Sequence, residues 1–511
     1  MLIDYRDLDP NQARAVFYNS NTPVLVIGDA GTGKMTVAAL RIRWLLENGV
    51  DPDEILVLVS HKQTGTGERL ADLLRDMPGL ADTEIETREV HELCRSIVSK
   101  HLDDVDRLLF WDRETDRIEV VYNDLDDEDD DIDDEGDDVS CSVRRKVQLI
   151  GERTRRQIID SVIKGFSDLE SGDSLARLRL YEKIRRLKSN MLFPEDVKGD
   201  EHYWQYYNYQ KVLANNLLLD AEDIYVAICR LFQSKADLRQ AFRERYRYAL
   251  VLDYQELTRA EQIALREMFG RRHHLMLFGN KNQAMNEVRY GFPDGLDLFH
   301  IDYDGGEVIR LTQVYRPVPE VEYIRAEEES DELKLLEDLT DRLHEQGYQK
   351  HEIAVFCHTA DEVRVYSRRL PKATVCHLWN ARSREFKIVI LPGMDEEHIT
   401  RTYVTNLERR GKAGLDSRAI YHMIYQGITR ATEKVYLSWV AKRTYGDLTV
   451  VSQLSRVLDS VEDDFQSRAK VNHVIAAAQN VGSESGSKEL GIGDRCRSKK
   501  EKAGTIVTKC L

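Results

Sequence analysis

A glycine-rich segment near the N-terminus has the spacing of a phosphate-binding loop. Residues 26–36 read VIGDAGTGKMT, in which four residues separate the first glycine from a Gly-Lys pair. In such loops backbone N–H groups and the lysine hold nucleotide phosphates, and a Ser or Thr hydroxyl directly after the lysine ligates magnesium. Met35 stands at that position, and a thioether is a poor ligand for a hard cation. The residues predicted to bind the nucleotide here are Gly28, Gly31, Gly33, Lys34 and Thr36.

The sequence around this loop predicts the elements that hold it in place. A polar turn, LDPNQ, opens a helix that runs through Val16, and the apolar segment PVLVIG then forms a strand leading into the loop. Helical periodicity follows in MTVAALRIRWLLENG, and EILVLVS is a second apolar strand. Strand, loop, helix and strand form the parallel unit that phosphate loops require.

Length and composition indicate a globular protein of two or three domains. The chain has 511 residues, of which 42% are hydrophobic and 32% are charged. No apolar run reaches the roughly 18 residues that span a bilayer, and the acidic N-terminus lacks a signal-peptide pattern. The seven cysteines include no CxxC pair. We therefore expect a cytoplasmic protein with no membrane association.

The net charge of −17 is concentrated in one segment. Residues 124–138, DLDDEDDDIDDEGDD, hold 12 acidic and no basic side chains, and without them the net charge is −5. So dense an acidic run favours a solvated, disordered loop. The remaining balance does not exclude a local basic groove for nucleic acid.

The pattern along the chain predicts an α/β fold with two parallel-sheet domains. Charged amphipathic helices dominate the middle, and short apolar strands return in RYALVLD, HLMLFGN, EIAVFCH, FKIVILPG and KVYLSWV. The predicted divisions are a first α/β domain at 1–96 and 243–270, a helical insertion at 97–242, a second α/β domain at 271–470, a linker at 471–490 and a basic tail at 491–511.

Nine ordered segments between Leu8 and Leu437 carry a resemblance to a known family. They are LDPNQARAV, GDAGTGK, VHELCRSIV, NNLLLDAEDIY, RYALVLDYQELTRAEQ, FGNKNQ, LTQVYRP, REFKIVILPG and IYQGITRATEKVYL. Their order resembles the motifs of the UvrD, Rep and PcrA DNA helicases. The resemblance implies two RecA-like domains, 1A and 2A, that close over ATP, with a helical domain 1B inserted in the first. About 60 residues separate Arg316 from Val375, too few for the family's large 2B domain.

The resemblance also implies roles for residues around the nucleotide. Gln12 is expected to contact adenine, Tyr315 to stack on the base and Glu385 to reach the ribose. Around the γ-phosphate it places Gln255, Gln283, Arg316 and Arg430. Arginines at such positions stabilise charge on a transferring phosphoryl group.

The metal and base positions depart from the family pattern. Where the family has Asp-Glu before an aromatic residue and Gln, this chain has Leu252 and Asp253 before Tyr254 and Gln255. Asp253 can therefore serve as the base or, with a one-residue shift, as a magnesium ligand, but not as both. Together with Met35, this predicts ATP binding with weak magnesium ligation and slow or absent hydrolysis.

Two alternatives stay open at this point. The chain is an active 3′-to-5′ single-stranded DNA translocase if Thr36 or water completes the metal site and Asp253 acts as base. It is a non-catalytic interaction module if the acidic run imitates DNA or covers a DNA groove. Small UvrD-like proteins in phage defence suggest, by analogy, a nuclease or another DNA-processing subunit as partner.

The family's single-stranded DNA track is only partly present. Ser60, Asn286, Val288 and Trp379 occupy places where the family has aromatic or histidine side chains. A weaker track is predicted from Lys62, His91, Arg289, Tyr290, Trp379 and Arg382. Ordinary packing is the alternative for His91 and Trp379. The segment GDRCRSKKEKAGTIV resembles the first strands of the family's Tudor-like barrel, with a basic disordered tail as the alternative.

Overall fold

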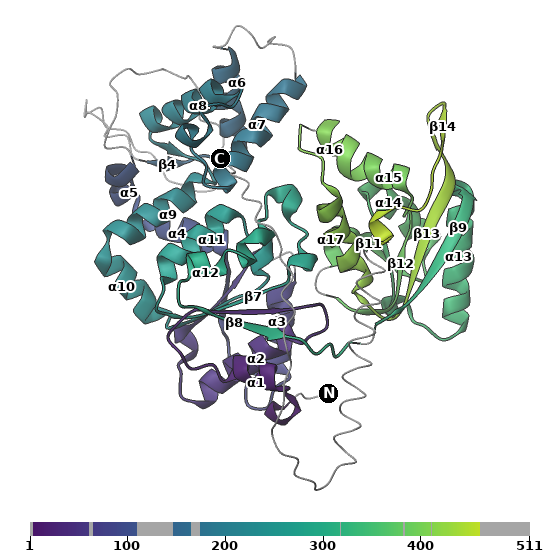
Figure 1. Cartoon of the computed structure of the whole chain (residues 1–511), viewed down its shortest axis with the longest axis horizontal. Helices are drawn as coiled ribbons and strands as arrows, with labels where there is room; N and C mark the ends of the chain where they lie inside the picture. Colours follow the sequence, from purple (N-terminus) through teal and green to yellow (C-terminus); the bar gives the residue numbers. More distant parts are fainter. Residues whose placement is uncertain are drawn as a thin grey trace, which may run out of the picture.

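The computed structural model describes residues 4–60, 65–109, 147–164, 174–316, 318–381, 384–409 and 411–459. These residues form two α/β units side by side, with a small helical body above the first unit in the view of Figure 1. The fold class predicted from the sequence is confirmed. No helix within these ranges is long and apolar enough to cross a membrane.

The first unit is built on a fully parallel sheet. Its described strands are β1 (Val24–Gly28), β2 (Ile55–Val59), β3 (Glu86–Glu89), β6 (Tyr248–Val251), β7 (His274–Gly279) and β8 (Glu307–Leu311), in the order β3-β2-β6-β7-β1-β8. Strands β1 and β2 are apolar over most of their length and are covered on both faces, as parallel sheets require.

Two apolar layers bury this sheet. Helices α1 (Pro10–Val16), α2 (Lys34–Glu47) and α3 (Thr66–Arg75) cover one face. The other face packs against α4 (Val90–Lys100), α5 (Leu102–Leu109), α9 (Asp223–Ser234), α11 (Arg259–Phe269) and α12 (Phe299–Asp302), with α10 (Ala236–Arg245) beside α9 and α11.

The predicted boundary between residues 270 and 271 is wrong. Strand β7 pairs with β6 and β1, and β8 pairs with β1, so the first sheet continues to Leu311. The predicted second domain, residues 271–470, includes the apolar segment that forms β7. Strand composition does not reveal which sheet a strand joins, because pairing partners lie far away along the chain.

The independent helical body is smaller than the predicted insertion at 97–242. Its own core joins α6 (Glu152–Lys164), α7 (Ser174–Ser189) and α8 (Tyr203–Asn216), beside the short parallel pair β4 (Gln148–Leu149) and β5 (Leu218–Leu219). Helices α4, α9 and α10 pack with the first sheet instead. The predicted acidic loop at 124–138, linker at 471–490 and basic tail at 491–511 lie outside the described residues.

The second unit contains a mixed but mainly parallel sheet. Its described strands are β9 (Glu320–Glu328), β10 (Ile353–Cys357), β11 (Thr374–His377), β12 (Phe386–Leu391), β13 (Ala431–Tyr445) and β14 (Leu448–Val451), ordered β11-β10-β12-β13-β14 with β9 beside β13. Only β14 among them is antiparallel.

The helices of this unit cover both faces of its sheet. They are α13 (Glu329–Glu345), α14 (Ala360–Arg369), α15 (Glu396–Thr400), α16 (Asn406–Arg409) and α17 (Ser417–Ile428), with a π-helical turn at Arg401–Thr405. Described residues between Arg316 and Val375 form β9, α13, β10 and α14 of this unit. That segment therefore adds to the second sheet and forms no separate domain in the described part.

Candidate functional site

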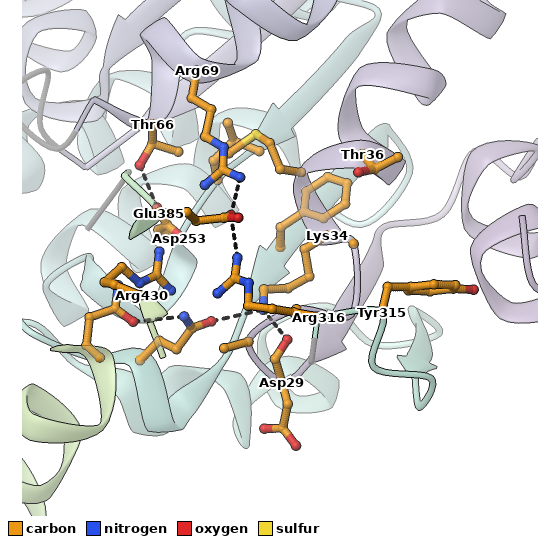
Figure 2. A pocket seen from close by; sticks show the side chains of 18 of the residues that line it. Asp29, Lys34, Thr36, Thr66, Arg69, Asp253, Tyr315, Arg316, Glu385 and Arg430 are labelled. Atoms are coloured by element: carbon orange, nitrogen blue, oxygen red, sulfur yellow. Dashed lines mark hydrogen bonds and ion pairs between the residues drawn. The ribbon is translucent and has the colours of Figure 1, made fainter. Parts of the chain in front are cut away.

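A cavity of about 410 Å³ lies between the two units. It opens at the carboxyl ends of β1 and β6, where loops of parallel sheets place binding groups. Residues from the second unit close the other side (Figure 2). The lining includes these predicted site residues: Gly31, Gly33, Lys34, Thr36, Asp253, Gln255, Gln283, Tyr315, Arg316, Glu385 and Arg430.

The glycines of the loop are required by its backbone and by close neighbours. Gly31 and Gly33 have φ angles of +85° and +84°, in the left-handed region that favours glycine. A Cβ at Gly28 would lie 2.9 Å from the Leu311 Cβ on the neighbouring strand β8. The loop therefore passes tightly over the sheet and leads directly into the N-terminus of α2, which favours anions.

Lys34 forms hydrogen bonds within its loop and to the turn that follows β7. Its Nζ donates to the carbonyl oxygens of Gly28 (2.6 Å) and Asp29 (3.1 Å) and to Gln283 Oε1 (3.0 Å). Gln283 in turn donates to Gln426 Oε1 on α17 at 2.8 Å. One hydrogen-bonded chain thus runs from the phosphate-binding loop to the second unit.

Glu385 lies between two arginines at the centre of the cavity (Figure 2). Arg69 Nη2 on α3 donates to Glu385 Oε1 at 2.5 Å, and Arg316 forms an ion pair with the same oxygen. Burial raises the pKa of this carboxyl, but the two guanidinium groups outweigh it and hold the pKa below its usual range. Arg316 also donates to the Thr429 carbonyl of the second unit at 2.5 Å.

Arg430 is the most deeply buried arginine of the cavity. It is 4% exposed, and its Nη2 donates to Thr429 Oγ1 at 3.3 Å. Burial and the nearby Arg316 lower its pKa to about 9, which leaves it charged at neutral pH. A buried cation next to another cation provides strong attraction for an anionic ligand.

Asp253 provides a carboxylate at the end of β6. Its φ of +53° is unusual for a residue other than glycine, and its Oδ2 accepts a hydrogen bond from Thr66 Oγ1 at 2.9 Å. Leu252, at the family's aspartate position, is 2% exposed and packs in the core. Met35 and Thr36 also line the cavity. Within the described ranges no three His, Cys, Asp or Glu side chains gather as a metal cluster.

Gln12 and Tyr315 lie together beside the loop. Gln12 is 4% exposed and donates to the Thr32 carbonyl at 3.0 Å, while its Oε1 accepts from the Tyr315 hydroxyl at 3.2 Å. Tyr315 also donates to Asp9 Oδ2 at 2.8 Å and is 45% exposed. The exposed ring leaves a face for a stacking partner at the rim of the cavity.

Several lining residues were missed by sequence reasoning. They are Asp29, Thr66, Arg69, Glu256, Gln426 and Thr432. Gln426 falls within a quoted family segment, so its position was a usable signal. Arg69 had none, because a helix-surface arginine gains meaning only when the second unit places Glu385 against it.

The described residues of the predicted DNA track differ in their surroundings. His91 Nδ1 pairs with the Tyr225 hydroxyl at 2.8 Å on α9, and burial lowers the histidine's pKa. Tyr290 donates to Glu182 on α7 and faces the helical body. Trp379 packs in the second unit's core, whereas Arg289 is exposed. Lys62 and Arg382 lie outside the described residues.

Comparison with known proteins identifies the family. The model of the UvrD/REP helicase N-terminal domain matches residues 8–304, more than half of the chain. The chain belongs to the UvrD/REP helicase family. The match covers the phosphate-binding loop and strands β1, β2, β3, β6 and β7, and it ends just after α12, before β8.

Curated relatives in this family are distant and longer. The ATP-dependent DNA helicase PcrA of Bacillus subtilis (strain 168) is 22% identical over 510 residues, which cover 89% of this chain and 63% of the relative. PcrA of Staphylococcus epidermidis (strain RP62A) is also 22% identical, over 61% of this chain and 38% of the relative. The chain thus spans less than two thirds of the length of these relatives.

Proposed function

We propose that this chain is a UvrD/Rep-like ATP-binding protein of DNA metabolism with impaired hydrolysis and unwinding. It serves as a nucleotide-binding subunit or scaffold of a DNA-processing assembly in the cytoplasm. The observation that supports this most directly is the cavity, which keeps the anion-binding groups while Met35 and Leu252 occupy metal positions. Its cations are Lys34, Arg69, Arg316 and Arg430.

The cavity has the chemistry that a triphosphate requires. Tight glycine turns leave backbone N–H groups at the start of α2, and three arginines lie opposite them. In this proposal Lys34 and the loop hold the β- and γ-phosphates, Tyr315 stacks on the base, and Gln12 and Glu385 contact adenine and ribose. Bound magnesium would neutralise phosphate charge.

The groups available to a cation are fewer than the family pattern provides. Asp253 supplies the carboxylate that follows β6, and it already accepts a hydrogen bond from Thr66. Neither Met35 nor Leu252 has a side-chain oxygen that could ligate a cation. If Asp253 ligates the cation, no acidic side chain stands at the base position, and a misplacement of about 1 Å can cost on the order of 100-fold in rate.

Nucleotide titration at varied magnesium tests the proposal. We expect ATP to bind with similar affinity with and without magnesium, and hydrolysis to stay at least about 100-fold below ordinary family members even with single-stranded DNA. The triple variant Met35→Thr, Leu252→Asp, Asp253→Glu should raise turnover strongly. DNA-stimulated turnover at ordinary family rates in the unaltered protein overturns the impaired-motor proposal.

An active 3′-to-5′ translocase is the second candidate. Thr36 and Asp253 both line the cavity, so a hydroxyl and a carboxylate are available there. In that case Thr36→Val should abolish turnover, while Met35→Ala should leave it nearly unchanged. Under the leading proposal both variants have the same low turnover. Both candidate functions include weak binding of single-stranded DNA and a nuclease-like partner.

A further inference from the structure

A basic cavity lies at the amino ends of the strands of the first sheet, whereas the nucleotide cleft lies at their carboxyl ends. It measures about 500 Å³ and is lined by Asn21, Ala236, Arg239, Gln240, Arg243, Glu244, Arg247, Arg272, His273 and His274. Strands β6 and β7 begin at Tyr248 and His274, so the cavity is at their amino ends. Helix α10, which forms one wall, faces away from the second unit (Figure 1).

The lining is strongly positive in an acidic protein. Four arginines line it against one glutamate, although the chain carries a net charge of −17; one of the four, Arg247, is paired with Glu54 at 3.3 Å. Arg239 and Arg243 are one turn apart on α10, and such like-charged pairs are unfavourable in a helix without a compensating partner. Burial and the proximity of Arg239 both lower the pKa of Arg243.

Part of this charge is already used by the fold. Arg243 donates to the carbonyl oxygens of Met268 (2.8 Å) and Glu267 (3.1 Å), at the C-terminus of α11. Arg239 donates to the Phe232 carbonyl of α9 at 2.6 Å. These bonds hold both guanidinium groups in fixed places, and the partial negative charge of the helix-end carbonyls offsets only part of their positive charge.

Arg272 differs from Arg239 and Arg243 in its surroundings. It is exposed on the turn between α11 and β7, and the described residues offer it no hydrogen bond or ion pair. The neighbouring cavity shares Arg239 and Arg243, but its Arg266 is paired with Glu267 and Asp302. The excess positive charge is therefore concentrated in the cavity that contains Arg272.

We propose that this basic cavity binds phosphate groups, with the backbone of a nucleic-acid strand as the favoured source. Guanidinium groups recognise phosphate through paired N–H donors. Arg239 and Arg243 are separated by about 6 Å along the helix axis, and Arg272 approaches from another element. A ligand with several phosphates fits this arrangement better than a single anion. The proposal stands independently of ATP hydrolysis.

Charge reversal at Arg272 tests the proposal with an adjacent control. Arg272→Glu removes a side chain that the fold does not use. Arg271→Glu makes the same charge change one residue away, outside this cavity, and breaks only an exposed ion pair with Asp304. Binding of a fluorescent 20-nucleotide oligo-dT is followed by anisotropy over a range of salt concentrations. Binding of inorganic tripolyphosphate and ATP is followed by calorimetry.

We expect Arg272→Glu to weaken oligo-dT binding about 10-fold at low salt and to reduce the salt slope by about 0.7 per lost phosphate contact. Arg271→Glu should change the affinity less than about 2-fold, and ATP affinity should stay the same in both. An effect on tripolyphosphate alone supports the phosphate site and identifies a free polyphosphate as its ligand. Equal effects of both variants on both ligands, or no effect of Arg272→Glu on either, overturn the proposal.

Discussion

At the scale of single residues, the cleft is organised around one lysine that has several partners. Lys34 contacts two loop carbonyls and Gln283, and these bonds hold its ammonium group where phosphate oxygens would lie. Replacing them with phosphate contacts exchanges neutral acceptors for charged ones, which strengthens each hydrogen bond.

Lys34→Ala should therefore weaken ATP binding by about 10- to 100-fold, since a hydrogen bond to a charged group contributes about 1.5–3 kcal/mol. Calorimetric titration of ATP measures the change. Lys281→Ala is the matched control, because Lys281 forms ion pairs with Asp294 and Asp297 away from the cavity. Equal affinity of Lys34→Ala and the unaltered protein contradicts the nucleotide site.

We expect phosphate and Glu385 to compete for the same two arginines. Its carboxylate pairs with Arg69 and Arg316. Glu385→Gln should free both guanidinium groups and raise the affinity for inorganic tripolyphosphate by about 2- to 5-fold, the range of partly exposed ion pairs. Calorimetry with tripolyphosphate measures this without any ribose contact. A lower affinity in the variant argues against competition.

At the scale of elements, helix α17 connects the cleft to the second unit. Gln426 lies within it, and Thr429 and Arg430 follow directly after its last residue, before β13 begins. Because these three residues are close in sequence, one short segment places all of them at the cleft. A shift of this one helix would move all three relative to the phosphate-binding loop.

A buried histidine joins three other elements of the second unit. His358 follows β10, and its Nε2 donates to the Pro392 carbonyl at 2.8 Å, while its Nδ1 accepts from the Tyr403 hydroxyl at 2.6 Å. Tyr403 belongs to the π-helical turn, so His358 helps to fix that irregular segment. Besides Tyr403, the titratable groups that influence the pKa of His358 are Glu362, His398 and His377.

Burial lowers the pKa of His358 to about 4. In the unfolded chain a histidine takes up a proton as the pH falls through about 6.5, whereas the folded His358 stays neutral. Its contribution to stability is thus present above pH 6.5 and is lost between pH 6.5 and 4. His358→Gln should make the free energy of unfolding less sensitive to pH, by about 2 kcal/mol between pH 7 and 5.

Urea unfolding at the two pH values measures this difference. His351→Gln is the control, because His351 is exposed at the start of the same strand segment. If His358→Gln and the unaltered protein have the same pH sensitivity, His358 is not the source of this pH dependence. The variant is also expected to be less stable at pH 7, because the Pro392 and Tyr403 bonds are disturbed.

Local patterns in the sequence predicted most elements but not their pairing. The apolar segments at β1, β2, β6, β10, β12 and β13 were all identified as strands, because short apolar runs between helical segments are local signals. The sheet that β7 joins was not predicted, since it depends on hydrogen bonds to distant strands. The polar strand β9 was also missed, as its outward-facing charges hide its pairing with β13.

In the candidate site, too, local motifs predicted some residues, whereas the placement of others depends on packing. Lys34, Arg316 and Arg430 were predicted because their motifs are local, and the structure brings them into one cavity. The sequence predicts Tyr290 as part of a DNA surface, and its contact with α7, where its hydroxyl donates to Glu182, could not be predicted. Side-chain direction depends on packing that the motif does not encode.

At the scale of the whole molecule, charge is distributed very unevenly. Residues 124–138 carry 12 of the acidic side chains, and the basic cavity carries four arginines at the amino ends of the strands of the first sheet. A polyanion approaching the protein experiences both fields, and the acidic run repels it over a Debye length of about 10 Å at 0.1 M salt.

Replacing residues 124–138 with a Gly/Ser segment of equal length changes the net charge from −17 to −5. We expect oligo-dT affinity to rise about 10-fold at low salt and the difference to vanish near 1 M salt, where the Debye length falls to about 3 Å. Anisotropy titrations across salt concentrations measure both effects. The replacement should leave ATP affinity unchanged, because the cleft is formed by other segments. An unchanged DNA affinity at low salt contradicts any role of the acidic run in limiting access to DNA.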